Sequence, residues 1–232
     1  MRLITIAGPP SSGKTSVILR AIDCLKKEGL KAGVIKFDCL TSFDQVRYTE
    51  SGVPNHVGYS GKICPDHFYV ANIEEAVQWG LRTGLDIMVT ESAGLCNRCS
   101  PYIEGVSSVC VIDNLSGVNT PKKLGPMLRY ADVVVVTKGD IVSQAEREVF
   151  AFNIRQINPR ADVLFVNGIT GQGAFLLARF MKEANEVKGV TDKRLRFTMP
   201  ASVCFYCTGV QFIKKHHQSY PAPVRSIDFK GE

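Results

Sequence analysis

Short apolar runs alternate along the chain with longer segments in which apolar residues recur at helical spacing. The apolar runs predict buried strands at 3–7, 32–37, 85–90, 106–112, 132–137 and 162–167. The helical spacing predicts helices at 15–27, 73–81, 121–130, 143–158 and 173–185. Strands that are apolar along their whole length and separated by helices are typical of a parallel sheet covered by helices. We therefore expect an α/β fold with a mostly parallel sheet flanked by helices.

The pattern changes near residue 189, where the alternation of strands and helices ends. A strand-like segment at 195–205 is followed by a basic tail that contains prolines. We therefore expect two parts, a domain over 1–188 and a short cysteine-containing extension over 189–232.

The composition is ordinary for a globular protein, because 45% of the 232 residues are hydrophobic and 22% are charged. No apolar stretch reaches the ~20 residues of a membrane-spanning helix, and the first apolar run is too short for a secretory signal. We expect a cytoplasmic protein without a membrane partner. The net charge of +6 lies partly in the tail with no aromatic or basic stripe, so we expect no nucleic-acid partner.

The stretch GPPSSGKTS at 8–16 matches the phosphate-loop pattern GxxxxGK[ST] and lies between a predicted strand and a predicted helix. Backbone N–H groups and the helix N-terminus would hold phosphates, Lys14 would reach the β- and γ-oxygens, and Thr15 would bind Mg²⁺. A glycine turn with a surface lysine is the alternative, and the strand–loop–helix context argues against it. We expect a P-loop NTPase whose loop binds nucleotide through Gly8, Ser11, Ser12, Gly13, Lys14, Thr15 and Ser16.

Polar residues follow three further predicted strands. Thr137-Lys138-Gly139-Asp140 has the form that reads guanine in GTPases, and Asn167 and Gly168 follow the next strand. Glu91 and Asp38 also stand at strand ends, where with Thr15 they would organise Mg²⁺ and the attacking water, and Gly94 would approach the γ-phosphate. Each motif alone fits an ordinary surface turn, but together they predict GTP binding, with Lys14, Asp38 and Glu91 as catalytic residues.

The phosphate loop, Asp38, Thr90-Glu91-Ser-Ala-Gly94 and the TKGD motif occur in an order that resembles the metallochaperone GTPases of the SIMIBI class. These are the urease accessory GTPase and the hydrogenase nickel-incorporation GTPase, and the resemblance covers roughly residues 1 to 185. It implies a GTP-dependent homodimer that carries a metal ion, usually nickel, to a client apo-metalloenzyme. TESAG and TKGD depart slightly from the usual forms, and a His-rich segment is absent.

The cysteines supply candidate metal ligands, since eight are many for a cytoplasmic chain, where disulfides are rare. Cys64-Pro-Asp-His67 resembles the family's Cys-Pro-His element with an inserted Asp, and Cys64 with His67 would suit nickel or zinc. A half-buried cysteine and a loop histidine are the alternative. Two CxxC pairs follow, Cys96/Cys99 just after the γ-phosphate loop and Cys204/Cys207 in the tail. Together the pairs could hold zinc or an iron–sulfur cluster, or only a structural zinc knuckle.

The sequence thus predicts a GTPase that hydrolyses GTP to GDP and phosphate and handles a metal for another enzyme. One rival is a nucleotide-dependent reductase activator with a dimer-bridging iron–sulfur cluster, as in the nitrogenase iron protein that the cysteine loop resembles. A second rival is a small-molecule kinase or nucleotide-binding adaptor, for which the sequence offers no acceptor pocket.

Overall fold

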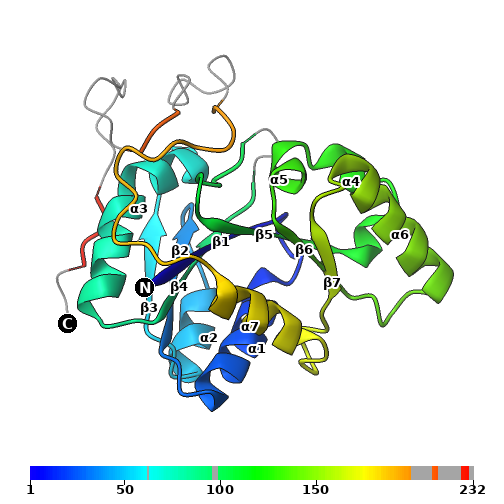
Figure 1. Cartoon of the computed structure of the whole chain (residues 1–232), viewed down its shortest axis with the longest axis horizontal. Coiled ribbons are helices and arrows are strands. Elements are labelled where there is room, and N and C mark those ends of the chain that lie inside the picture. The colour runs from blue at the N-terminus through cyan, green and yellow to red at the C-terminus, as the bar shows by residue number, and fades with distance from the viewer. Residues whose placement is uncertain (62, 96–98, 200–210, 214–225, 230–232) are drawn as a thin grey trace.

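Seven parallel strands form one sheet in the order β3-β2-β4-β1-β5-β6-β7 (Figure 1). The computed structural model describes residues 1–61, 63–95, 99–199, 211–213 and 226–229. The strands are β1 (Arg2–Ala7), β2 (Ala32–Asp38), β3 (Asn55–Tyr59), β4 (Ile87–Ser92), β5 (Ser107–Asp113), β6 (Val133–Thr137) and β7 (Asp162–Phe165). The expected parallel α/β sheet is confirmed.

Helices cover both faces of this sheet. They are α1 (Lys14–Lys27), α2 (Asp44–Glu50), α3 (Pro65–Arg82), α4 (Thr120–Lys123), α5 (Pro126–Arg129), α6 (Gln144–Ile157) and α7 (Ala174–Glu183), with a 3₁₀ turn at Asn114–Ser116. Side chains of α1, α2 and α7 share one core with the sheet. On the other face, α3 packs over the β2–β4 half, and α5 and α6 pack over β5 and β6. In the part of the chain that the structure describes, no helix is long and apolar enough to cross a membrane.

Several predicted boundaries were wrong for local reasons. The expected helix at 121–130 is two short helices, because Gly125 adopts φ 53° and Pro126 starts a new first turn. Helix α3 begins at Pro65, eight residues before the predicted start at 73. The sequence analysis missed α2 and β3, and the strand expected at 195–205 is reduced at 194–195 to isolated bridges with Phe212 and Ile103. The rest of that segment, from 200 onward, lies outside the described residues.

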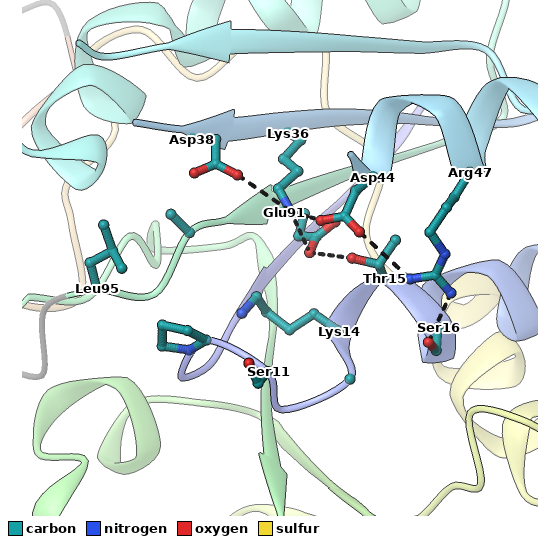
Figure 2. Close-up of a pocket in the computed structure, with 13 residues that line it drawn as sticks. Ser11, Lys14, Thr15, Ser16, Lys36, Asp38, Asp44, Arg47, Glu91 and Leu95 are labelled. Carbon is teal, nitrogen blue, oxygen red and sulfur yellow. Dashed lines mark hydrogen bonds and ion pairs between the residues drawn. The ribbon is translucent and has the colours of Figure 1, made fainter. Parts of the chain in front are cut away.

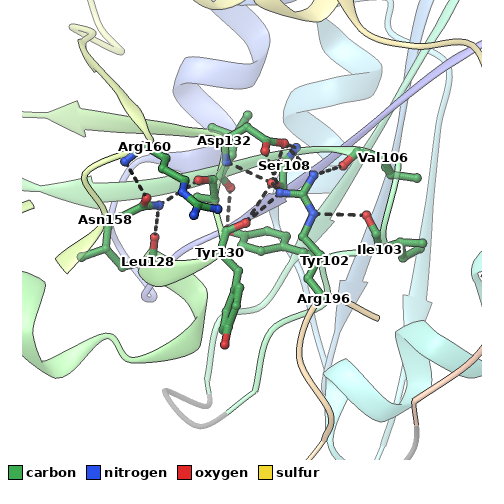
Figure 3. A network of polar contacts seen from close by, with 12 residues as sticks. Tyr102, Ile103, Val106, Ser108, Leu128, Tyr130, Asp132, Asn158, Arg160 and Arg196 are labelled. Carbon is green, nitrogen blue, oxygen red and sulfur yellow. Dashed lines mark hydrogen bonds and ion pairs between the residues drawn. The ribbon is translucent and has the colours of Figure 1, made fainter. Parts of the chain in front are cut away.

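The chain after α7 returns to the sheet and is held there by Arg196 (Figure 3). Its guanidinium donates to both carboxylate oxygens of Asp132, at 2.7 and 2.8 Å, and to the carbonyls of Tyr130 and Val106, at 2.9 and 2.7 Å. Apolar side chains of the same region join the core beside α3, namely Val187, Val190, Leu195, Met199 and Ile213. The described start of the predicted extension is therefore packed onto the domain, and the division after residue 188 stays a prediction.

Candidate functional site

The phosphate loop connects β1 to α1 at the carboxyl edge of the sheet and lines a cavity of about 400 Å³ (Figure 2). Gly13, just before α1, has φ 89°, a conformation that favours glycine. The Lys14 ammonium lies over the loop and donates to the carbonyls of Gly8 and Pro9, each at 2.9 Å. Burial lowers the pKa of Lys14. A cation and a helix N-terminus thus meet where the sequence predicts phosphate binding.

The loop after β4 touches the phosphate loop through its backbone. Gly94 has φ 71°, and a Cβ at this position would lie 1.6 Å from the carbonyl oxygen of Gly8. No residue with a side chain fits such an approach. The predicted γ-phosphate loop is therefore held directly against the predicted phosphate cradle.

Three carboxylates gather at the opposite wall of the cavity, and we call Asp38, Asp44 and Glu91 the carboxylate cluster (Figure 2). Thr15 Oγ1 donates to Glu91 Oε1 at 2.9 Å, which joins two residues predicted to organise Mg²⁺. The third, Asp38, lies at the end of β2, with its Oδ2 3.6 Å from the ammonium of Lys36. Oxygen donors from a hydroxyl and carboxylates suit Mg²⁺, so these residues fit the ion.

The sequence analysis missed three residues that line this wall, Lys36, Asp44 and Arg47, and the buried Tyr48 behind them. The Tyr48 hydroxyl donates to Glu91 Oε2 at 2.6 Å, and burial, then the charge of Glu91, raises its pKa well above the usual value. Arg47 Nη2 donates to Ser16 Oγ at 3.0 Å, which ties α2 to the first turn of α1. A lysine in an otherwise apolar strand is a signal that could have found Lys36.

Two of the predicted base-reading residues, Asp140 and Asn167, line a second cavity of about 260 Å³. Gly139, Asp140 and Asn167 lie along this cavity, with the Arg147 guanidinium 4.5 Å from the centre of the Phe165 ring on another wall. Asn167 Oδ1 accepts from the backbone N–H groups of Ile169 and Thr170, at 2.8 and 2.9 Å, which shapes the loop after β7.

Contacts of the TKGD motif join this base cavity to the phosphate loop. Lys138 Nζ donates to the carbonyl of Ser11 at 3.0 Å, and Thr137 Oγ1 donates to the carbonyl of Ser12 at 2.7 Å. Gly168 lies against the first turn of α1, since a Cβ there would be 2.8 Å from Cβ of Ser16. The structure therefore brings the two predicted halves of a nucleotide site together.

A separate group of possible metal ligands lies at the N-terminus of α3. The ligand atoms of Cys64, Asp66 and Cys99 are all within 4.8 Å of one another. Cys64 is the residue just before α3, Asp66 lies in the first turn of that helix, and Cys99 belongs to the chain that follows the γ-phosphate loop. Asp66 is only 2% exposed, and burial, then the neighbouring Cys64, raises its pKa to about 8. Two sulfurs and a carboxylate are a donor set that can hold a transition metal.

The structure groups Cys64 with Asp66 and Cys99 as possible ligands, and the predicted pairing of Cys64 with His67 stays a prediction. His67 is not part of the three-residue group, and Asp66, treated in the sequence analysis as an insertion, takes that place. His67 is buried, which lowers the pKa of its imidazole. Of the two predicted CxxC pairs, Cys96, Cys204 and Cys207 lie outside the described residues.

Comparison with known proteins gives the family. Residues 2–165 match the model of the CobW/HypB/UreG nucleotide-binding domain. The chain belongs to the CobW/HypB/UreG family. That match contains the phosphate-loop cavity, Asp140 and the Cys64–Asp66–Cys99 group, whereas Asn167 and Gly168 follow it in the chain.

Individual relatives agree with this assignment. The uncharacterized protein MJ0120 of Methanocaldococcus jannaschii is 46% identical over 237 residues, covering 100% of both chains. The urease accessory protein UreG 2 of Methylorubrum populi is 31% identical over 194 residues, covering 77% of this chain and 89% of that protein. HypB from Helicobacter pylori, solved in complex with nickel, shares the fold with a TM-score of 0.64 and 20% identity, over 79% of this chain and 86% of that one. The P-loop NTPase fold of the CobW/HypB/UreG family is therefore confirmed.

Proposed function

We propose that this CobW/HypB/UreG family member is a GTP-hydrolysing metallochaperone that delivers a metal ion, nickel in the first place, to a client metalloenzyme. The observation that carries the proposal is the placement of the Cys64–Asp66–Cys99 group. Cys99 stands five residues after Gly94, whose backbone lies against the phosphate loop. A ligand of the metal and a sensor of the nucleotide thus share one short segment of chain.

The nucleotide site supports GTP hydrolysis at the two cavities. Asp140 would accept hydrogen bonds from the guanine N1–H and amino group, and Lys138 would lie along the base. Lys14 would exchange its contacts with Gly8 and Pro9 for the β- and γ-phosphate oxygens. Mg²⁺, when bound, supplies positive charge against those oxygens, while Asp38 and Glu91 orient the ion's ligands and the attacking water.

The donor set supports a single metal ion as cargo. Two thiolates and a carboxylate suit nickel or zinc, whereas an iron–sulfur cluster is generally held by four cysteines. Within the described residues the group contains two cysteines, so the iron–sulfur reductase activator has less support than the metallochaperone. Among the described residues, the site geometry gives no support to a small-molecule kinase or nucleotide-binding adaptor. Thiolate ligands need a reducing compartment, so we propose that the protein acts in the cytoplasm.

We also propose that GTP binding favours a homodimer. Large apolar side chains are exposed near the nucleotide cavity, with Leu40 at 73%, Phe43 at 86% and Leu95 at 58% of their accessible surface. Leu95 lines that cavity and follows Gly94 directly. Exposed apolar side chains of this size, on segments that flank the nucleotide, favour an interface that depends on the nucleotide.

The test is to measure Ni²⁺ and Zn²⁺ affinity for the apo, GDP-bound and GTP-analogue-bound protein, with dimer mass measured by light scattering. We expect one metal per site, tighter binding in one nucleotide state, and loss of at least ten-fold in affinity for Cys64→Ser and Cys99→Ser. Cys24→Ser, on α1 away from the group, is the matched control and should bind metal as the wild type does. Equal metal affinity in all nucleotide states would contradict the proposal. Metal affinity of Cys64→Ser and Cys99→Ser equal to that of the wild type and of Cys24→Ser would also contradict it. A brown protein after anaerobic purification would favour the iron–sulfur rival.

A further inference from the structure

Lys36 brings a positive charge into the middle of the carboxylate cluster. It stands on β2, and its register partner on the neighbouring strand β4 is Glu91. Residues paired in this way project to the same face of a parallel sheet, so the two side chains are neighbours by virtue of the backbone. The Lys36 side chain is 7% exposed, so its ammonium is held within the site.

The ammonium of Lys36 contacts all three carboxylates of the cluster. Its Nζ lies 3.4 Å from Glu91 Oε1 and 3.6 Å from Asp38 Oδ2, and it also donates to Asp44 Oδ2. Burial acts against the charged form, but the charges of Glu91 and Asp44 raise the pKa of Lys36 overall, so the ammonium stays charged. Lys14, the cation of the phosphate loop, bonds to loop carbonyls instead.

The formal charges of the cavity balance only because Lys36 is present. The charged side chains that line it are the three carboxylates together with Lys14, Lys36 and Arg47, which sum to zero. Without Lys36 the sum is −1, and three convergent carboxylates form the kind of oxygen site that divalent cations bind. Asp44 is also held by Lys36, which lowers its pKa although burial opposes the change.

We propose that Lys36 is a positioning residue that excludes free divalent cations from Asp38, Asp44 and Glu91 until nucleotide phosphates arrive. Lys36 and a divalent ion compete for Glu91 Oε1 and Asp44 Oδ2, because both need the same carboxylate oxygens. The strand register keeps the backbone of Lys36 beside that of Glu91, so the ammonium stays close to this carboxylate. A nucleotide shifts the balance, because its phosphates bring negative charge and further oxygen ligands for the ion.

Exclusion has a clear use in a chain that handles a metal, and this part of the inference rests on the proposed function. The proposed transition-metal site at Cys64 and Cys99 lies in the same domain as the carboxylate cluster. An open site of three carboxylates would bind that ion, or any other divalent ion, in the wrong place. Lys36 keeps the cluster closed to ions that arrive without nucleotide.

The first experiment uses the wild-type chain without nucleotide. Mn²⁺ is the probe, because it prefers oxygen ligands over thiolates and its free form is measured by electron paramagnetic resonance. We expect no tight Mn²⁺ binding by the nucleotide-free protein and one bound Mn²⁺ per chain in the presence of GDP. Mg²⁺ alone should leave the melting temperature unchanged, whereas Mg²⁺ with GDP should raise it. Tight Mn²⁺ binding by the nucleotide-free wild type would overturn the proposal without any variant.

The second experiment removes the charge. Lys36→Met, whose unbranched side chain is one atom shorter and uncharged, should bind Mn²⁺ without nucleotide at least ten-fold more tightly than the wild type. The double variant Lys36→Met/Glu91→Gln should lose the gain, and Lys36→Arg should keep the exclusion. Lys182→Met is the matched control, because it removes a lysine from a surface ion pair with Glu28, 2.6 Å apart.

The outcomes separate this inference from the proposed function. A Lys36→Met variant that folds but binds Mn²⁺ no better than the wild type would assign Lys36 a purely structural role and overturn the proposal. If that variant does not fold, tight Mn²⁺ binding by the nucleotide-free wild type or Lys36→Arg protein would still overturn the proposal. A chain that excludes Mn²⁺ yet binds no nickel at Cys64 and Cys99 would keep the role of Lys36 and remove the metallochaperone.

Discussion

Replacing Arg196 by alanine should destabilise the whole domain, although Arg196 lies in the predicted extension. The guanidinium holds both oxygens of Asp132 and the carbonyls of Tyr130 and Val106, and it also donates to Ser108 Oγ at 2.8 Å. Alanine removes all of these bonds, and of the two Asp132 oxygens Oδ2 still accepts from the N–H and Oγ of Ser108, each at 2.9 Å. A hydrogen bond to a charged group contributes about 1.5–3 kcal/mol, and an unpaired buried acceptor costs a similar amount.

The environment of Arg196 sets the size of the effect. Its side chain is 20% exposed and that of Asp132 is 40% exposed, so water replaces part of what is lost. We therefore expect a loss of about 3 kcal/mol in the free energy of unfolding, well below the sum of the separate bonds. For a chain of 232 residues this corresponds to a fall in melting temperature of roughly 6–12 °C.

Urea unfolding and calorimetry measure the effect, and two variants calibrate it. Arg196→Lys keeps the charge but cannot form the two-pronged contact with Asp132, so it should recover only a small part of the stability. Arg179→Ala removes an exposed pair with Glu183 at 4.0 Å and should change stability by less than about 0.5 kcal/mol. An Arg196→Ala protein within about 0.5 kcal/mol of the wild type would refute the reasoning, because the contacts would then be replaced fully by water.

Three further predictions concern the base, the loop and the attachment of the chain after α7. Asp140→Asn should weaken GTP binding more than ten-fold and favour xanthosine triphosphate, as measured by nucleotide competition; equal affinity of the wild type for ATP and GTP would remove the guanine assignment. Gly94→Ala should abolish tight nucleotide binding while the chain still folds, as judged by circular dichroism, because its methyl group would collide with Gly8; binding at wild-type strength would contradict the close approach. Glu74 accepts from the N–H groups of Val190 and Thr191 at 2.6 and 2.8 Å, and although burial opposes it, these bonds lower its pKa. Its contribution to stability should therefore be complete above about pH 5 and lost as the pH falls below about 4, so urea unfolding should show Glu74→Gln differing from the wild type at pH 6 but hardly at pH 3.

Local chain chemistry made most of the sheet predictable. The run of valines in β6 predicts a buried strand, and the glycines of the phosphate loop predict a phosphate site, from a few neighbouring residues alone. Strand β3, with the sequence NHVGY, could not be predicted in this way, because it has neither an apolar run nor a clean alternation of apolar and polar residues. Its pairing with β2 comes from the tertiary structure. Helix α2, with the sequence DQVRYTE, is similarly short and polar, and one buried residue, Tyr48, anchors it.

The residues of the candidate site also divide into those that the sequence predicts and those that only the fold brings together. Thr15 and Glu91 could be predicted because each belongs to a motif at a strand end. Lys36 could not be given a role, because its partners come from another strand and from a helix that the sequence did not predict. The choice between Asp66 and His67 depends on helix rotation, since neighbouring residues of a helix point about 100° apart. In the structure the carboxylate of Asp66 lies within 4.8 Å of the sulfurs of both Cys64 and Cys99.

The contact between Gly94 and Gly8 has a mechanical consequence. Two backbone segments meet there without a side chain between them, so the contact has no soft element that could absorb a small displacement. Packed protein interiors have low compressibility, and bare backbone is stiffer than a layer of rotatable side chains. A shift of the phosphate loop by a fraction of an ångström is therefore passed undiminished to Gly94. In the proposed metallochaperone this rigid contact would pass movement of the phosphate loop to the chain that leads to Cys99, and a methyl group at Gly94 would disrupt it.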